Sequence, residues 1–206
     1  DEYLPKDGSL QKKHFQDFMK RLRKELDKQG VRIRYYHCGE YGELLERPHY
    51  HAIIFGFNFP DRKLFTIRRG VRLYRSEMLE RLWPFGFSTV GDVTFESAAY
   101  VARYVLKKMN GEIVEQHYQG KQPEYTTMSR RPGIGHDWLM KYKDDVYNYD
   151  YVVIRNNIKC RPPRYYDEIF DSLEPEKFKK IKIKRRKYAM NGEYSEMRLR
   201  AKEEIQ

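Results

Sequence analysis

The chain has 206 residues, a length that suits one domain with a short appended segment. Hydrophobic residues make up 40% of it, enough to build a core, so the composition excludes wholesale disorder. The 41 basic residues outnumber the 30 acidic ones, and the net charge of +11 favours a polyanionic partner over an ordinary basic surface. Only Cys38 and Cys160 are present, which indicates a reducing compartment rather than a disulfide framework. No apolar run approaches the roughly 18 residues of a membrane span, so we expect no membrane partner.

The first third of the chain predicts a helix followed by a β-hairpin. Apolar residues recur at helical spacing after Ser9, a candidate N-cap, and the helix should end at Gly30. Residues 31–38 and 49–57 are rich in β-branched and aromatic side chains, which is typical of strands. A short segment with Gly and Pro separates them, so we expect the two strands to pair in antiparallel fashion.

The remainder predicts shorter elements. Trp83 and Trp138 are expected in the core or at its rim. After Pro175 the chain predicts a basic helical tail, in which residues 177–187 hold eight Lys or Arg; this run could bind DNA, dock a partner or form a solvated helix face. In chain order we expect a polar connection at 58–75 with one short strand, a helix at 76–82, a strand at 87–93, a helix at 94–110 ended by Gly111, an irregular segment at 112–140 and a strand at 151–155.

A candidate metal site lies on the predicted hairpin. Strand alternation puts His49 and His51 on one face and Tyr50 on the other. Glu40, near the end of the preceding strand, falls opposite one of the two histidines if an even number of residues closes the hairpin. Two imidazoles and one carboxylate suit Mn²⁺ or Mg²⁺. The alternatives are a pair of half-buried strand histidines, or a zinc site that also uses Cys38.

A candidate nucleophile cluster lies on the predicted helix at 94–110. At about 100° per residue, Tyr100, Tyr104 and Lys107 fall on one side, and the apolar residues fall on the other. A nearby cation favours the phenolate of a tyrosine, which is the nucleophilic form. The alternative is a pair of amphipathic surface tyrosines.

Together these motifs resemble the HUH endonuclease superfamily, and within it the replication initiators of Microviridae phages of the gokushovirus type. The likeness covers most of residues 1–170. It is carried by "DEYLP" at 1–5, "YYHCGEYGELLERPHYH" at 35–51, "PHYHAIIFG" at 48–56, "YVARYVLKK" at 100–108 and "MSRRPGIG" at 128–135.

The resemblance implies an α+β fold with a central antiparallel sheet and flanking helices, of the ferredoxin-like or RNA-recognition-motif type. Residues 1–170 would form the HUH endonuclease domain and residues 171–206 the basic helical tail. In that family a further strand usually precedes the "DEYLP" segment, so we expect the sheet formed by this sequence to lack one strand.

The resemblance also implies an activity: one tyrosine attacks single-stranded origin DNA, leaves a 5′-phosphotyrosine and a free 3′ hydroxyl, and the strand is later rejoined. The metal would be held by Glu40, His49 and His51. Lys107 would stabilise a phenolate or the developing charge on phosphorus. Phosphates would be gripped by Arg103, Lys108, Arg130 and Arg131, for which solvated surface charge is the alternative.

The expected setting is the cytoplasm of a bacterial host cell, with a host polymerase and helicase as partners. The chain has no Gly-x-x-x-x-Gly-Lys-Ser/Thr run, so we expect neither a built-in helicase nor a nucleotide cofactor. Two other interpretations stay open. One is an HUH transposase or plasmid initiator with the same chemistry; the other is a non-catalytic module that binds single-stranded nucleic acid by stacking and charge.

Overall fold

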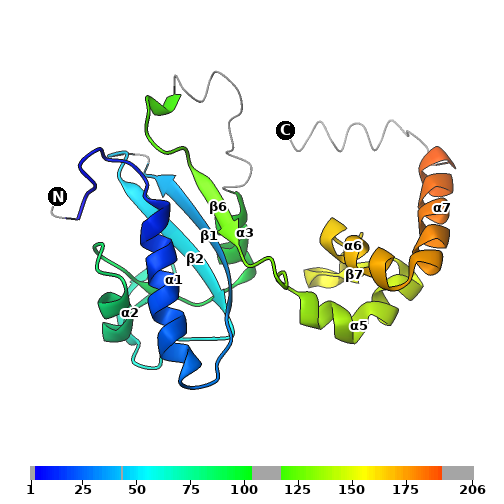
Figure 1. Ribbon diagram of the computed structural model, residues 1–206, viewed down its shortest axis with the longest axis horizontal. Helices are drawn as coiled ribbons and strands as arrows, with labels where there is room; N and C mark the ends of the chain where they lie inside the picture. The colour runs from blue at the N-terminus through cyan, green and yellow to red at the C-terminus, as the bar shows by residue number, and fades with distance from the viewer. Residues whose placement is uncertain (1–2, 43, 104–116, 192–206) are drawn as a thin grey trace. The chain divides into compact units, whose positions relative to one another are not determined.

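The computed structural model describes residues 3–42, 44–103 and 117–191 (Figure 1). The chain divides into two compact units, Asp1–Ile134 and Gly135–Gln206, which are treated separately below. Helices and small antiparallel sheets confirm the predicted α+β class. The predicted domain boundary between residues 170 and 171 falls inside helix α6 (Arg164–Leu173), whereas the two compact units meet before α5.

The first unit is built around a three-stranded antiparallel sheet. Strand β1 (Arg34–Tyr41) lies in the centre, with β2 (Pro48–Phe55) on one side and β6 (Tyr125–Met128) on the other. The β1–β2 pairing confirms the predicted hairpin. Strand β6 corrects the irregular segment predicted at 112–140, because a four-residue strand carries too short a pattern to signal itself and is defined by its ladder with β1.

Two helices cover opposite faces of this sheet. Helix α1 (Lys12–Asp27) packs on the face that carries His37, whose ring stacks on Phe15 at a centroid separation of 3.5 Å. Helix α3 (Phe95–Arg103) packs on the other face, where Val101 joins a buried cluster with side chains of β1 and β2. Figure 1 shows α1 crossing the front of the sheet. The sheet therefore presents one face to each helix.

Helix α1 forms because its apolar residues recur on one side, as predicted. Its buried side chains are Phe15, Phe18, Met19, Leu22 and Leu26. The predicted N-cap is wrong: Gln11 occupies that position and makes no side-chain cap. Ser9 is instead buried, and its hydroxyl accepts a hydrogen bond from the Gln122 backbone N–H at 2.8 Å. A long-range partner has thus replaced the local cap.

A second small sheet follows the hairpin. Strands β3 (Lys63–Arg68) and β4 (Val71–Arg75) pair, and β5 (Val90–Gly91) adds to β4. The connection at 58–75 therefore holds two strands rather than one, and the strand predicted at 87–93 is only two residues long. The β3–β4 turn uses Arg69 and Gly70, both with positive φ (48° and 78°). Asn or Asp is the usual partner of Gly in such a turn, so Arg69 hid the hairpin signal.

The predicted helix at 76–82 is confirmed as α2 (Glu77–Leu82). Ser76 caps it, since its hydroxyl accepts the Leu79 backbone N–H at 3.0 Å. Trp83, directly after α2, packs at the rim of the core made by α1 and α2, as predicted.

The second unit is mainly helical. Its core comprises Leu139, Val146, Tyr147, Phe170 and Phe178. Trp138, predicted in the core or its rim, is 46% exposed and stacks on Tyr166 instead. The elements are α5 (His136–Tyr149), β7 (Val152–Val153), the 3₁₀ turn η1 (Arg155–Asn157), β8 (Lys159–Cys160), α6 and α7 (Pro175–Asn191). Helix α5 was not predicted, whereas α7 confirms the helical character of the basic tail.

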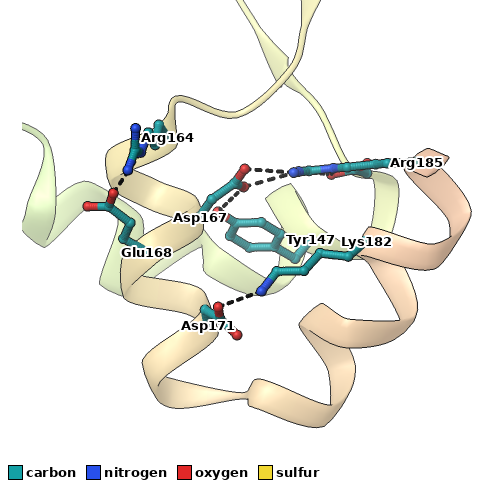
Figure 2. Close-up of polar contacts among 8 residues, drawn as sticks. Tyr147, Arg164, Asp167, Glu168, Asp171, Lys182 and Arg185 are labelled. Carbon is teal, nitrogen blue, oxygen red and sulfur yellow. Dashed lines mark hydrogen bonds and ion pairs between the residues drawn. The ribbon is translucent and has the colours of Figure 1, made fainter. Parts of the chain in front are cut away.

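An ion-pair cluster ties the three helices of this unit together. Arg185 of α7 contacts Asp150, just after α5, at 2.9 Å and Asp167 of α6 at 2.6 Å. Figure 2 shows the guanidinium facing Asp167, which also accepts a hydrogen bond from the Tyr147 hydroxyl at 3.1 Å. The bonds to Asp150 raise the pKa of Arg185, and burial raises the pKa of Tyr147. The cluster therefore fixes which side of α7 faces the core.

Candidate active site

The hairpin register puts the predicted metal ligands on one face of the sheet. Glu40 pairs with His49, and Cys38 pairs with His51, so all four side chains point to the α3 side. Tyr50 points to the α1 side, where its hydroxyl accepts the Gln11 backbone N–H at 2.8 Å. The predicted alternation is confirmed.

Glu40 and His51 form the centre of this face. His51 Nε2 lies 2.6 Å from Glu40 Oε1. The Glu40 side chain is 7% exposed and that of His51 34%, so the pair links a buried carboxylate to an open surface. A buried carboxylate requires such a polar partner, because its desolvation is otherwise costly.

His49 lies beside this pair, and a glycine makes room for its ring. A Cβ placed on Gly42 would come within 2.6 Å of His49 Cε1. The imidazole therefore lies against the end of β1, two residues beyond Glu40. Any larger side chain at position 42 would have to displace it.

Tyr100 brings a phenol to the same face. Its ring centroid lies 5.7 Å from that of His51, at an interplanar angle of 77°. The tyrosine is 49% exposed, whereas Val101, the next residue, is buried against Cys38 and Ile53. This contrast confirms the predicted separation of polar and apolar sides over the described part of the helix.

A cavity of about 850 Å³ opens along this region. Its lining includes His49, His51 and Tyr100, and it extends to aromatic side chains such as Trp83 and Phe85. The candidate residues therefore border a space large enough to admit part of a polymeric substrate.

The donor set fits a hard divalent cation. The Glu40 oxygen and the His51 nitrogen, already 2.6 Å apart, both have lone pairs to offer, and His49 lies on the same face. Across the described residues no three His, Cys, Asp or Glu side chains are gathered closely enough to hold a metal as they stand.

Cys38 does not suit the zinc alternative. Its side chain is fully buried in the apolar cluster with Ile53 and Val101. Burial, and then the nearby Glu40 carboxylate, raise the pKa of the thiol to about 12. Zinc needs a thiolate, so the structure favours a packing role for this residue.

Several predicted residues lie away from this centre. Arg130 and Arg131 lie just beyond β6, at the opposite end of β1 from Glu40, about 17 Å along the strand. Tyr104, Lys107 and Lys108 lie outside the described residues, as does the side chain of Arg103.

Arg130 and Arg131 have neighbours that the sequence did not indicate. Arg23 of α1 and Arg34 of β1 line with them a second cavity of about 570 Å³. Hydrogen bonds between Tyr35 and Ser129, in both directions, hold this end of the sheet together. Four arginines therefore converge from three segments. Only their positive charge was visible in the sequence.

These features define an α+β protein whose antiparallel sheet presents a carboxylate, two imidazoles and a phenol on one face. The model of the replication-associated protein ORF2 family matches residues 3–109, just over half of the chain. The chain belongs to this family. No solved structure matches it. Within the described residues, no helix combines the length and the apolar character needed to cross a bilayer.

Three curated phage proteins are similar to the chain. Replication-associated protein VP4 of Bdellovibrio phage phiMH2K is 36% identical over 92% of the chain, ORF2 of Spiroplasma virus 4 is 34% identical over 85%, and ORF4 of Chlamydia phage 1 is 32% identical over 82%. The aligned regions cover 62%, 56% and 44% of those proteins, so the chain spans about half the length of the curated relatives it matches.

Proposed function

We propose that the chain is a phage replication initiator that nicks single-stranded origin DNA through a tyrosine and later rejoins it in rolling-circle replication. The observation that carries the proposal is the contact between Tyr100 and His51, with ring centroids 5.7 Å apart, while His51 lies 2.6 Å from Glu40. A phenol thus stands beside a carboxylate–imidazole pair. The three relatives, all named replication-associated proteins of phages, favour an initiator over a transposase.

The proposed reaction exchanges one phosphodiester bond for another. The phenol oxygen of Tyr100 or Tyr104 bonds to phosphorus, the bond from phosphorus to the 3′ oxygen breaks, and the proton of the phenol ends on the 3′ hydroxyl. Lys107 stabilises the phenolate or the charge that develops on phosphorus. Attack by a 3′ hydroxyl on the phosphotyrosine reverses the exchange and rejoins the strand. The covalent link conserves the bond energy, so no nucleotide cofactor is needed.

Glu40, His49 and His51 would hold Mn²⁺ or Mg²⁺. Such a cation, when bound, polarises the scissile phosphate. Glu40 orients the His51 ring, and the burial of Val101 directs the neighbouring phenol towards it.

Other components follow from the same proposal. A host polymerase would extend the 3′ hydroxyl, a host helicase would unwind the template, and both act inside the bacterial cell. The second tyrosine would cut the regenerated origin after one round. The DNA backbone would be gripped by Arg103, Lys108, Arg130 and Arg131.

The test is formation of a covalent adduct. Labelled single-stranded origin DNA from the phage genome, incubated with the chain and Mn²⁺, should yield a protein–DNA band that survives denaturation. Replacing Tyr100 and Tyr104 together with Phe should remove the band, and EDTA should prevent it. The matched control is Tyr149→Phe with Tyr151→Phe, a tyrosine pair of the second unit with rings 5.9 Å apart. This control should leave the band unchanged.

Two results would contradict the proposal. An adduct that persists in the Tyr100/Tyr104 double variant would place the nucleophile elsewhere. Binding without any adduct, unaffected by EDTA, would instead identify a non-catalytic single-strand binding module.

A further inference from the structure

Helix α7 has one side committed to the core of the second unit. Phe178 is 3% exposed, Ile181 packs against the same core, and the Arg185 side chain, 11% exposed, is held by Asp150 and Asp167. These three residues recur at intervals of three and four, so they mark one face of the helix. Figure 2 shows Arg185 and Lys182 reaching from α7 towards α6. The rotation of α7 about its axis is therefore defined.

The opposite side of α7 carries a group of basic side chains that we term the α7 basic face. At about 100° per residue they fall on the side away from Phe178 and Arg185. Ile183, 49% exposed, lies among them. All of its members are exposed: Lys179, Lys180, Lys184, Arg186 and Lys187.

The acidic residues of this unit do not neutralise the α7 basic face. Lys177 pairs with Glu174 at 3.3 Å, and Lys182 pairs with Asp171 at 2.6 Å. The five members of the face make no ion pair with any residue in the described part of the chain. Residues 177–187 include no Asp or Glu. The available carboxylates thus serve the flank and the buried side of the helix.

This arrangement is unfavourable for the helix alone. Lys180 and Lys184 are four residues apart, and Lys184 and Lys187 three apart, so like charges are neighbours along the surface. A polyanion laid along the face would relieve this repulsion. From Lys179 to Lys187 the helix rises about 12 Å, which faces several successive phosphates.

We propose that the α7 basic face binds the phosphate backbone of single-stranded DNA without regard to sequence, as a second DNA-binding surface separate from the candidate active site. The choice of DNA over an acidic protein rests on the proposed function, whose substrate is a single strand. The exposed Ile183 offers an apolar contact to sugars or bases between the phosphates.

The experiment measures binding of fluorescein-labelled dT₃₀, which contains no origin, by fluorescence anisotropy at several salt concentrations. The test variant replaces Lys179, Lys180, Lys184 and Lys187 with Gln in the whole chain. Each phosphate contact contributes about 0.7 to the slope of log affinity against log salt for single strands, so the slope should fall by up to about 3. Affinity near 0.1 M salt should fall at least about tenfold.

A matched control removes four exposed lysines from α1, on the opposite face of the sheet from Tyr100. It replaces Lys13, Lys20, Lys24 and Lys28 with Gln and has the same net charge as the test variant. Its affinity and salt slope should stay within about twofold of the unaltered chain. A third variant, with Arg at the four α7 positions, should keep the binding. Equal losses in the α1 and α7 variants, or no loss in the α7 variant, would overturn the proposal.

A measurement on the unaltered chain covers the case in which the α7 variant fails to fold. Acetylation of exposed lysines, read by mass spectrometry, should slow at Lys179, Lys180, Lys184 and Lys187 when dT₃₀ is present, but not at Lys13 or Lys20. Equal acetylation with and without DNA would overturn the proposal. An acidic peptide that protects these lysines while dT₃₀ does not would identify a protein partner instead.

The outcome is separable from that of the proposed nicking reaction. A short origin strand at saturating protein should still form the adduct in the α7 variant, because Tyr100, His51 and Glu40 are unchanged. Absence of the adduct from the unaltered chain would refute the nicking proposal and leave the dT₃₀ measurement valid.

Discussion

At the scale of single residues, two histidines of the hairpin have opposite environments. His51 is partly open and lies against Glu40 and Tyr100. His37, on the other face, is 1% exposed, stacks on Phe15 and contacts the Thr127 hydroxyl at 3.0 Å. Burial lowers the pKa of His37 to about 3. One imidazole is thus placed for chemistry, while the other is a neutral part of the core.

The low pKa of His37 predicts a pH-dependent stability. The unfolded chain binds a proton at this histidine below about pH 6.5, whereas the folded chain does so only near pH 3, so its contribution is complete above pH 6.5 and is lost as the pH falls towards 3. Between pH 7 and pH 5 it should remove about 2 kcal/mol from the free energy of unfolding. Urea titrations followed by Trp83 fluorescence, in a Trp138→Phe background, measure this.

His37→Phe should remove that part of the pH dependence while keeping a ring against Phe15. A pH profile in which the variant loses as much stability as the parent between pH 7 and pH 5 would contradict the assignment of the effect to His37.

At the scale of elements, the β1–β2 hairpin and helix α3 build the candidate site together. The hairpin supplies Glu40, His49 and His51 through its register, and α3 supplies Tyr100 because its apolar side packs on the same face. The end of β1 also has to be flat, since the His49 ring lies over Gly42.

Gly42→Ala should therefore impair the site without unfolding the chain. The added methyl group would meet the His49 ring at 2.6 Å, and the ring would have to move from its place beside Glu40 and His51. We expect the adduct to form at least about tenfold more slowly, since a misplacement of about 1 Å can cost that much. The midpoint of thermal unfolding should change little.

The matched control is Gly91→Ala, where the nearest atom to an added Cβ, a methyl carbon of Leu73, lies at an ordinary 3.8 Å. This variant should form the adduct at the parent rate. Parent-like kinetics in Gly42→Ala would show that the position of His49 is unimportant.

At the scale of the whole molecule, the two compact units have different kinds of core. The first unit is organised by sheets with helices packed on them, and the second by three helices joined through Arg185. The two tryptophans are divided between them, Trp83 in the first unit and Trp138 in the second. Each unit therefore carries its own fluorescent reporter.

Arg185→Met should destabilise the second unit by about 2–3 kcal/mol, less than the 3–5 kcal/mol of a fully buried pair because Asp150 is 32% exposed. The loss arises because Asp150 and Asp167 remain as uncompensated carboxylates. Urea unfolding of a Trp83→Phe variant, reported by Trp138, should shift to lower urea. With Trp83 as the reporter, in a Trp138→Phe background, the transition should move far less. Equal shifts for both reporters would contradict this division.

The sequence alone determined the features that depend on local period: the apolar stripe of α1, the pairing of β1 with β2, and the common face of His49 and His51. Alternation along a strand and recurrence along a helix are set by backbone geometry, so they can be read without knowing the fold. Tertiary structure alone decided that β6 pairs with β1, that Ser9 binds Gln122 rather than capping a helix, and that four arginines meet at one end of the sheet. It also decided that Tyr100 lies beside His51. These contacts join segments tens of residues apart, and they form because apolar surfaces such as that of Val101 are buried together, which no local pattern specifies.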